Sequence, residues 1–138
     1  MEKVRVFLGI RDRNFSEKIK ALSGDVEIVG ESASLEAIKG NSKRIDLLFL
    51  DRIPLMGFSN SKIKRVIAAS RYSRKKEFLS VISGVKGFIT KDISEPYLLK
   101  AIKVISAGEI WMTRYTVAKV FEEYYRMAKG NGKRRILS

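Results

Sequence analysis

Short apolar stretches that recur along the chain constrain its fold more than any other feature. The stretch LLFL at 47–50 is apolar at every position rather than at alternate positions. A strand of this kind has both faces buried, as in a parallel sheet that helices cover on two sides. The predicted strands are the stretches at 4–10, 26–30, 45–50, 65–69 and 87–90.

Helical patterns fill most of the intervals between these strands. Apolar residues recur there every three or four positions, and serine or glycine stands where the helices should begin or end. The predicted apolar stripes are Phe15, Ile19 and Leu22; Leu35 and Ile38; Phe78, Leu79, Ile82 and Val85; and Leu98, Ile102 and Ile105. Strands that alternate with helices predict an α/β fold, a doubly wound sheet of five parallel strands.

The connection between the third and fourth strands departs from this pattern. Residues 51–64 are close to the minimum length of a parallel connection, about a dozen residues. Pro54, Gly57 and several serines stand where a crossover helix should be. We expect at most one helical turn, at 59–64.

The C-terminal part of the chain predicts one more helix and a tail. Thr113 is suited to begin the helix. Its apolar face would carry Val117, Val120, Phe121 and Tyr124. The tail KGNGKRRILS is basic and contains two glycines, so we expect the helix to end before it. The expected organisation is a domain at 1–110, a linker helix at 111–128 and a basic linker at 129–138.

The residue types that the chain lacks exclude several kinds of chemistry. Its 138 residues include no cysteine and no histidine, which excludes disulfides, thiolate metal sites and histidine acid–base catalysis. No segment approaches the roughly 18 apolar residues of a membrane span. The N-terminal apolar stretch is also too short for a signal peptide. We therefore expect a cytoplasmic protein without membrane contacts.

The net charge of +13 favours an anionic partner. Seven basic residues crowd the segment 62–76: Lys62, Lys64, Arg65, Arg71, Arg74, Lys75 and Lys76. This basic segment could contact nucleic-acid phosphates, but aromatic residues do not alternate with its charges in the way that base stacking on a single strand would require. A solvated, lysine-rich surface is the alternative.

Polar residues follow several predicted strands at their carboxyl ends. They are Asp51, Ser70 and Lys91 after the third, fourth and fifth strands, and Arg11 and Asp12 after Ile10 at the end of the first. In doubly wound sheets, ligands bind outside these ends, near the point where strand order reverses. The sequence therefore predicts that a carboxylate, a hydroxyl and an ammonium group converge on one pocket.

Residues 3–121 resemble the receiver domains of bacterial response regulators, in the NarL/FixJ (LuxR-type) branch. The segments that carry the resemblance are VRVFLGIRDRNFSEKIKAL, DLLFLDRIPLMG, GVKGFITKD and LLKAIKVISAGEIWMTR. The resemblance implies the CheY-like, flavodoxin-like receiver fold. GEIWMTR resembles the junction that leads to a DNA-binding domain in this branch.

The resemblance also implies roles for the residues at the carboxyl edge. Asp51 matches the aspartate that accepts a phosphoryl group from a histidine kinase. Ser70 matches the hydroxyl that hydrogen-bonds the phosphate, and Lys91 matches the lysine that pairs with it. A carboxylate nucleophile, a hydroxyl donor and a fixed cation are what an acyl phosphate needs. Tyr72 and Phe88 correspond to the aromatics that report switching.

The sequence departs from the family where Mg²⁺ should bind. The family places two acids at the end of the first strand, and Ile10 and Arg11 stand at those positions. Mg²⁺ is held mainly by carboxylates, and Asp12 is the one acid nearby, so we expect weak or no Mg²⁺ binding and no cofactor. The third crossover is also shorter than in the family.

These departures predict an atypical receiver, the regulatory half of a transcriptional regulator, that acts through protein contacts without Mg²⁺-dependent phosphorylation. Asp51 would pair with Lys91 or with the Arg11 guanidinium, which would hold the domain in one state. One alternative is a receiver that is phosphorylated at Asp51, and another is a nucleic-acid-binding module built on 62–76. No enzymatic activity is expected, because a phosphatase that used Asp51 would need an acid where Ile53 stands.

The partners that the resemblance implies are a cognate histidine kinase, a second copy of the chain and DNA. DNA would be bound by a helix-turn-helix domain missing from this chain. Leu137 and Ser138 resemble the first residues of such a domain.

Overall fold

The computed structural model describes residues 2–53 and 62–137, with side chains as far as residue 129. Its strands are β1 (Val4–Gly9), β2 (Val26–Glu31), β3 (Leu47–Leu50), β4 (Lys64–Ala69) and β5 (Gly87–Thr90). Its helices are α1 (Arg13–Lys20), α2 (Leu35–Gly40), α3 (Arg74–Ile82), α4 (Glu95–Ser106) and α5 (Arg114–Leu137), with a 3-10 turn at Ser42–Arg44. The elements follow the predicted order.

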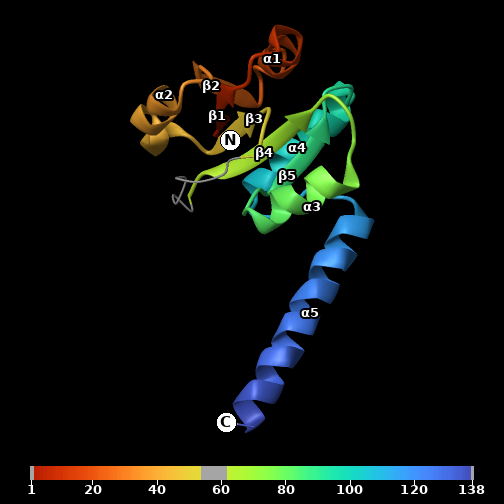
Figure 1. Ribbon diagram of the computed structural model, residues 1–138. Coiled ribbons are helices and arrows are strands. Elements are labelled where there is room, and N and C mark those ends of the chain that lie inside the picture. Colours follow the sequence, from red (N-terminus) through yellow and green to blue (C-terminus); the bar gives the residue numbers. More distant parts are fainter. Residues whose placement is uncertain (1, 54–61, 138) are drawn as a thin grey trace.

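The five strands form one parallel sheet in the order β2-β1-β3-β4-β5. The strand order reverses at β1, so the carboxyl ends of β1 and β3 lie side by side, with Gly9 paired to Leu50. The prediction of a doubly wound α/β fold is therefore confirmed. Figure 1 shows the sheet with helices on both of its faces.

Alternate residues of each strand point to opposite faces of the sheet and belong to different core layers. Val6 and Leu8 of β1 pack with Phe15 and Ile19 of α1 and with the apolar stripe of α4. Phe7, between them, faces the other side of the sheet, where it packs with Ile38 of α2. Because both faces are buried, the strands show continuous apolar runs, as expected for a covered parallel sheet.

The stripe that was predicted for helix α3 is buried only in part: Val85, just after the helix, is in the core and Phe78 is half-buried. Ile82 is 58% exposed and Leu79 is also exposed, while the buried residues of the helix are Glu77 and Ser80. The helix is rotated so that a carboxylate, rather than the apolar stripe, faces the start of α5. The prediction was wrong for Leu79 and Ile82 because periodicity identifies an amphipathic helix but not its packing partner.

The short third crossover is described only in part. Lys64 begins β4, and residues 62 and 63 are not helical. Residues 62–64 thus contain no helix, which agrees with the expectation of at most one helical turn, and the part of that expectation at 59–61 lies outside the described residues. Pro54 and Gly57 lie outside them as well.

Helix α5 begins where predicted and continues beyond its predicted end. The Thr113 hydroxyl accepts a hydrogen bond from the Thr116 amide, as an N-cap does. The helix then continues without a break through Gly130 and Gly132 to Leu137, so the expected end at residue 128 is wrong. Each glycine costs about 1 kcal/mol relative to alanine, and the alanine, lysine and arginine residues around them favour the helix.

Figure 1 shows α5 leaving the layered domain and extending away from it. Its apolar residues are accordingly exposed, with Phe121 71% accessible to solvent. Among the helices of the described residues, none combines the length and apolarity that a membrane span requires.

Candidate functional site

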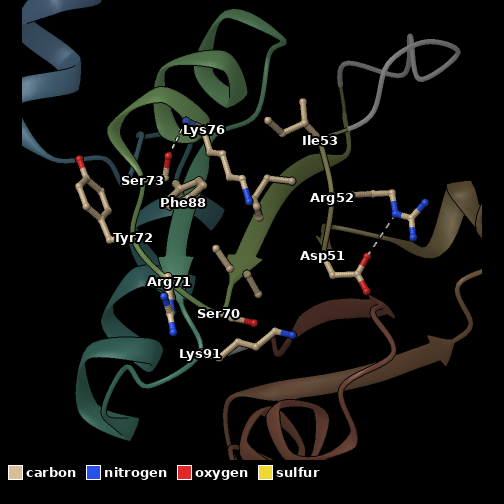
Figure 2. Close-up of a pocket in the computed structure, with 13 residues that line it drawn as sticks. Asp51, Arg52, Ile53, Ser70, Arg71, Tyr72, Ser73, Lys76, Phe88 and Lys91 are labelled. Atoms are coloured by element: carbon tan, nitrogen blue, oxygen red, sulfur yellow. Dashed lines mark hydrogen bonds and ion pairs between the residues drawn. The ribbon is translucent and has the colours of Figure 1, made fainter.

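The side chains of Asp51, Ser70 and Lys91 line one cavity at the carboxyl edge of the sheet. They follow β3, β4 and β5 directly, and the parallel pairing of these strands brings them to the same edge. The cavity has a volume of about 690 Å³. Figure 2 shows Ser70 and the Lys91 ammonium on one side of it and Asp51 on the other.

Asp51 is not paired as the sequence suggested. Its Oδ2 accepts a hydrogen bond from the backbone amide of Arg11 at 3.4 Å, rather than from the Arg11 guanidinium. The cation nearest to it is its neighbour Arg52, whose Nε lies 3.9 Å from Oδ1. The Asp51 side chain is 26% exposed, so it is screened only in part from solvent.

Lys91 pairs with Asp12 instead of Asp51. The Lys91 Nζ lies 3.3 Å from Asp12 Oδ2, and Asp12 Oδ1 also accepts a hydrogen bond from the Phe15 amide, so it caps α1. The Phe15 hydrogen bond and the Lys91 ammonium lower the pKa of Asp12 below its ordinary value. Asp12 is therefore an anion with two partners inside the protein.

Lys18 of α1 fixes the loop that presents Lys91. Its ammonium donates hydrogen bonds to the carbonyl oxygens of Lys91 and Ile93, both at 2.9 Å. On the other side, the Lys91 amide donates to the Ala69 carbonyl at the end of β4. The ammonium of Lys91 consequently projects from a backbone that is held from two sides.

The residues at the end of β1 do not fit a magnesium site. Ile10 is 4% exposed and belongs to the main core, and Arg11 is exposed. Asp12 is engaged by the cap and by Lys91. In the described part of the chain, no three acidic side chains gather as metal ligands would. Mg²⁺ is usually bound through one or two carboxylates, and of Ile10, Arg11 and Asp12 only Asp12 carries one, which is already engaged.

No protein-family model and no curated protein matches the sequence. Solved structures match over most of the chain. The signal receiver domain of the putative response regulator NarL from Mycobacterium tuberculosis is 25% identical, with a TM-score of 0.64 over 79% of this chain and 100% of that chain.

Two further structures match with lower sequence identity. The isolated receiver domain of RcsB from Salmonella enterica serovar Typhimurium, in its apo form, is 16% identical, with a TM-score of 0.68 over 87% of this chain and 99% of that one. A LuxR-family two-component response regulator from Aurantimonas sp. SI85-9A1 is 19% identical, with a TM-score of 0.66 over 90% of this chain and 99% of that one.

The chain has the fold of response-regulator receiver domains. Its strand order and the match to the whole NarL receiver domain agree with the fold that the sequence resemblance implied.

Two aromatic residues form the wall of this cavity on the side of α3. Tyr72 and Phe88 both line it, with ring centroids 6.1 Å apart and an interplanar angle of 83°. Phe88 is buried and Tyr72 is exposed. The Tyr72 hydroxyl donates a hydrogen bond of 2.8 Å to Glu77 Oε1.

Glu77 is the main polar residue of this domain that the sequence did not reveal. Its side chain is buried, and its carboxylate accepts hydrogen bonds from Tyr72, from the Thr113 amide at 2.9 Å, from the Thr113 hydroxyl at 2.6 Å and from the Thr116 hydroxyl. A glutamate in the first turn of a helix is common, so its position alone gave no signal. The sequence offered one signal for a buried acid, the two hydroxyl donors Thr113 and Thr116 at the start of α5.

The contacts of Glu77 fix the start of α5 against α3. Burial is the largest influence on its pKa and raises it, but the hydrogen bonds from Thr113, Thr116 and Tyr72 together lower the pKa below its ordinary value. The segment before α5 is held as well, because the Trp111 amide donates to Lys86 and the Trp111 carbonyl accepts from Phe88, beside β5. The cavity wall and α5 thus share one set of contacts.

The basic segment at 62–76 does not form one patch. Lys62, Lys64 and Arg65 lie at the start of β4, whereas Arg71, Arg74, Lys75 and Lys76 lie beyond its carboxyl end. The Arg74 guanidinium stacks over the Tyr115 ring at 4.0 Å, and Arg65 donates to the Ser83 carbonyl. A nucleic-acid surface that needs all seven residues on one face is therefore not supported.

Proposed function

We propose that the chain is an atypical receiver, a non-catalytic regulatory domain that acts through protein contacts without Mg²⁺-dependent phosphorylation. One observation carries the proposal: a core residue, Ile10, and an exposed cation, Arg11, stand where two acids would hold Mg²⁺ beside Asp51. Without that metal, the divalent charge that would stabilise a phosphoryl group transferring to Asp51 is missing.

The contacts of the edge residues support a fixed rather than a switched pocket. The Arg11 amide and the Arg52 side chain already engage Asp51, and Asp12 already engages Lys91. The Lys91–Asp12 pair is partly shielded from solvent, which strengthens it relative to a fully exposed pair, whereas the Arg52 side chain is 77% exposed and adds less. These contacts supply part of the neutralisation that a metal supplies in a phosphorylatable receiver.

The output of the domain is proposed to run through α5. Tyr72 touches both the cavity and Glu77, and Glu77 holds the first turn of α5. A change in the position of Tyr72 therefore alters the support of the helix. RcsB, which has the same fold, has been solved as dimers bound to DNA. By analogy, a homodimer and a DNA-binding partner domain belong to this proposal, as does a cytoplasmic location.

Incubation with an acyl phosphate donor and Mg²⁺ tests the proposal by intact-protein mass spectrometry. We expect no added phosphoryl mass, since the metal ligands are missing. A conventional phosphorylatable receiver, treated in parallel, controls for the donor. A phosphoryl adduct that disappears in Asp51→Asn would overturn the proposal.

The arrangement of Asp51, Ser70 and Lys91 around one cavity favours a second candidate, a receiver phosphorylated at Asp51 by a histidine kinase. Asp51 is accessible in part, and the hydroxyl and the ammonium lie on the opposite wall. The same mass measurement separates the two candidates, because only the second predicts the adduct.

A further inference from the structure

The cavity at the carboxyl edge carries an excess of positive charge. Its lining includes four cations, Arg52, Arg71, Lys76 and Lys91, but only one carboxylate, Asp51. Within residues 2–53 and 62–129, no carboxylate pairs with Lys76 or Arg71. A concave surface with unpaired charge of one sign attracts ligands of the opposite sign.

Two of these cations are directed into the cavity. Figure 2 shows the Lys76 side chain descending from α3 toward the middle of the cavity, and the Lys91 ammonium reaching in beside Ser70. Arg71, in contrast, points away from it. Lys91 keeps donors available despite its contact with Asp12, because an ammonium group has three. The interior therefore offers two ammonium groups and a serine hydroxyl from three different elements.

The rest of the cavity wall is apolar, which limits the kind of anion that the cavity could bind. Ile53, Ile67 and Phe88 provide an apolar surface, and Tyr72 adds an aromatic ring at the rim. The volume of about 690 Å³ lies within the range of about 300–1,000 Å³ that is usual for small-molecule sites. A bare inorganic ion would leave the apolar wall without contacts.

We propose that this cavity reversibly binds a small organic anion, a molecule with one phosphate or carboxylate group on an apolar body. Lys76 and Lys91 contact the anionic group with Ser70, and Phe88 and Ile67 contact the apolar body. The inference rests on the proposed function, because phosphorylation of Asp51 would place a competing negative charge at the same site. No covalent bond is formed.

The position of Tyr72 gives ligand binding a route to α5. Tyr72 lines the cavity and donates to Glu77, which holds Thr113 at the start of the helix. A ligand that displaces the Tyr72 ring changes this support. In an unphosphorylated receiver, a small anion would thus occupy the place of the phosphoryl group as the input signal.

Calorimetric titration of the whole chain with four probes tests the proposal. Phenyl phosphate and benzoate carry the two anionic groups on an aromatic body, inorganic phosphate lacks the body, and benzyl alcohol lacks the charge. We expect saturable binding of phenyl phosphate or benzoate, at least about tenfold weaker binding of inorganic phosphate, and none of benzyl alcohol. The stronger of the two aromatic anions identifies the preferred group.

Two lysines on the same turn of α3 provide a matched pair of variants. Lys76 lines the cavity and its neighbour Lys75 does not, so Lys76→Gln and Lys75→Gln change the net charge equally. We expect Lys76→Gln to weaken binding about tenfold and Lys75→Gln to change it less than twofold. Circular dichroism checks that both variants are folded.

Two results would overturn the inference. One is the absence of saturable binding by either aromatic anion, and the other is an equal loss of affinity in the two lysine variants, which would indicate non-specific charge attraction. The proposed function fails separately, through a phosphoryl adduct on Asp51. If the chain showed neither a phosphoryl adduct nor anion binding, the proposed function as an atypical receiver would still hold, and only the proposed ligand would be refuted.

Discussion

Glu77 carries its charge in the packed region between α3 and α5, where burial would ordinarily favour the neutral acid. Hydrogen bonds from Tyr72, Thr113 and Thr116 replace the water that the carboxylate loses. Removing the carboxylate would leave these donors in a site shaped for an anion. The residue therefore couples the stability of the domain to the attachment of α5.

We expect Glu77→Ala to lower the free energy of unfolding by about 2–3 kcal/mol, because several hydrogen bonds to a charged group are lost together. Urea unfolding followed by circular dichroism measures the change. Glu36→Ala is the matched control, since Glu36 is an exposed acid in the first turn of α2 and its loss should cost at most about 1 kcal/mol. Equal losses in the two variants would contradict the role given to Glu77.

The pH dependence of stability tests the same group. The pKa of Glu77 is lower in the folded domain than its ordinary value of 4.5, so its contribution is fully present above pH 4.5. That contribution is lost as the pH falls through the folded-state pKa. The wild type should therefore lose more stability in acid than Glu77→Gln, and the difference between them removes the effect of other carboxylates.

At the residue scale, the sequence identified the polar groups at the carboxyl edge but not their partners. Asp51, Ser70 and Lys91 could be placed because each directly follows a strand of a parallel sheet. Lys91 pairs with Asp12 rather than with Asp51. This pairing could not be predicted, because the long flexible lysine side chain can reach either carboxylate.

Among the secondary-structure elements, α5 depends most on its first turn, because most of the helix lies away from the domain. Thr113 caps the helix and is also a partner of Glu77. Apolar residues that are largely exposed, such as Phe121, contribute little to its attachment in the isolated chain. The contacts around Thr113 thus decide how firmly the helix is held.

We expect Thr113→Ala to lower stability by about 1–2 kcal/mol and to speed amide hydrogen exchange in the first turns of α5. Ser94→Ala is the control, since Ser94 precedes α4 but its side chain makes no capping hydrogen bond. Hydrogen-exchange mass spectrometry compares the two helices in both variants. Unchanged exchange in α5 of Thr113→Ala would show that the cap does not hold the helix.

Helix positions could be predicted better than helix faces. Serines at 34, 73 and 94 preceded α2, α3 and α4 as expected, because N-cap preference is a local property of the chain. The buried face of α3 is set by Glu77 and by a distant helix start, which no local pattern encodes. The end of α5 was misjudged because glycines weaken a helix without forbidding it.

For the molecule as a whole, alternation of apolar strands and helices was enough to predict the sheet. No strand boundary differs from its predicted position by more than two residues. The receiver fold followed from the order β2-β1-β3-β4-β5, which places β1 and β3 at the centre of the functional edge. The fold fixes where the site lies, whereas the residues after β1 determine what it can bind.

Titration of the whole chain with Mg²⁺ in a calorimeter tests the central claim most directly. Because Ile10 is buried in the core and Asp12 is held by Phe15 and Lys91, we expect no saturable heat at millimolar Mg²⁺. Addition of beryllium fluoride, a phosphoryl mimic, should not produce Mg²⁺ binding either. Saturable Mg²⁺ binding that is lost in Asp51→Asn would contradict the account and restore a phosphorylatable receiver.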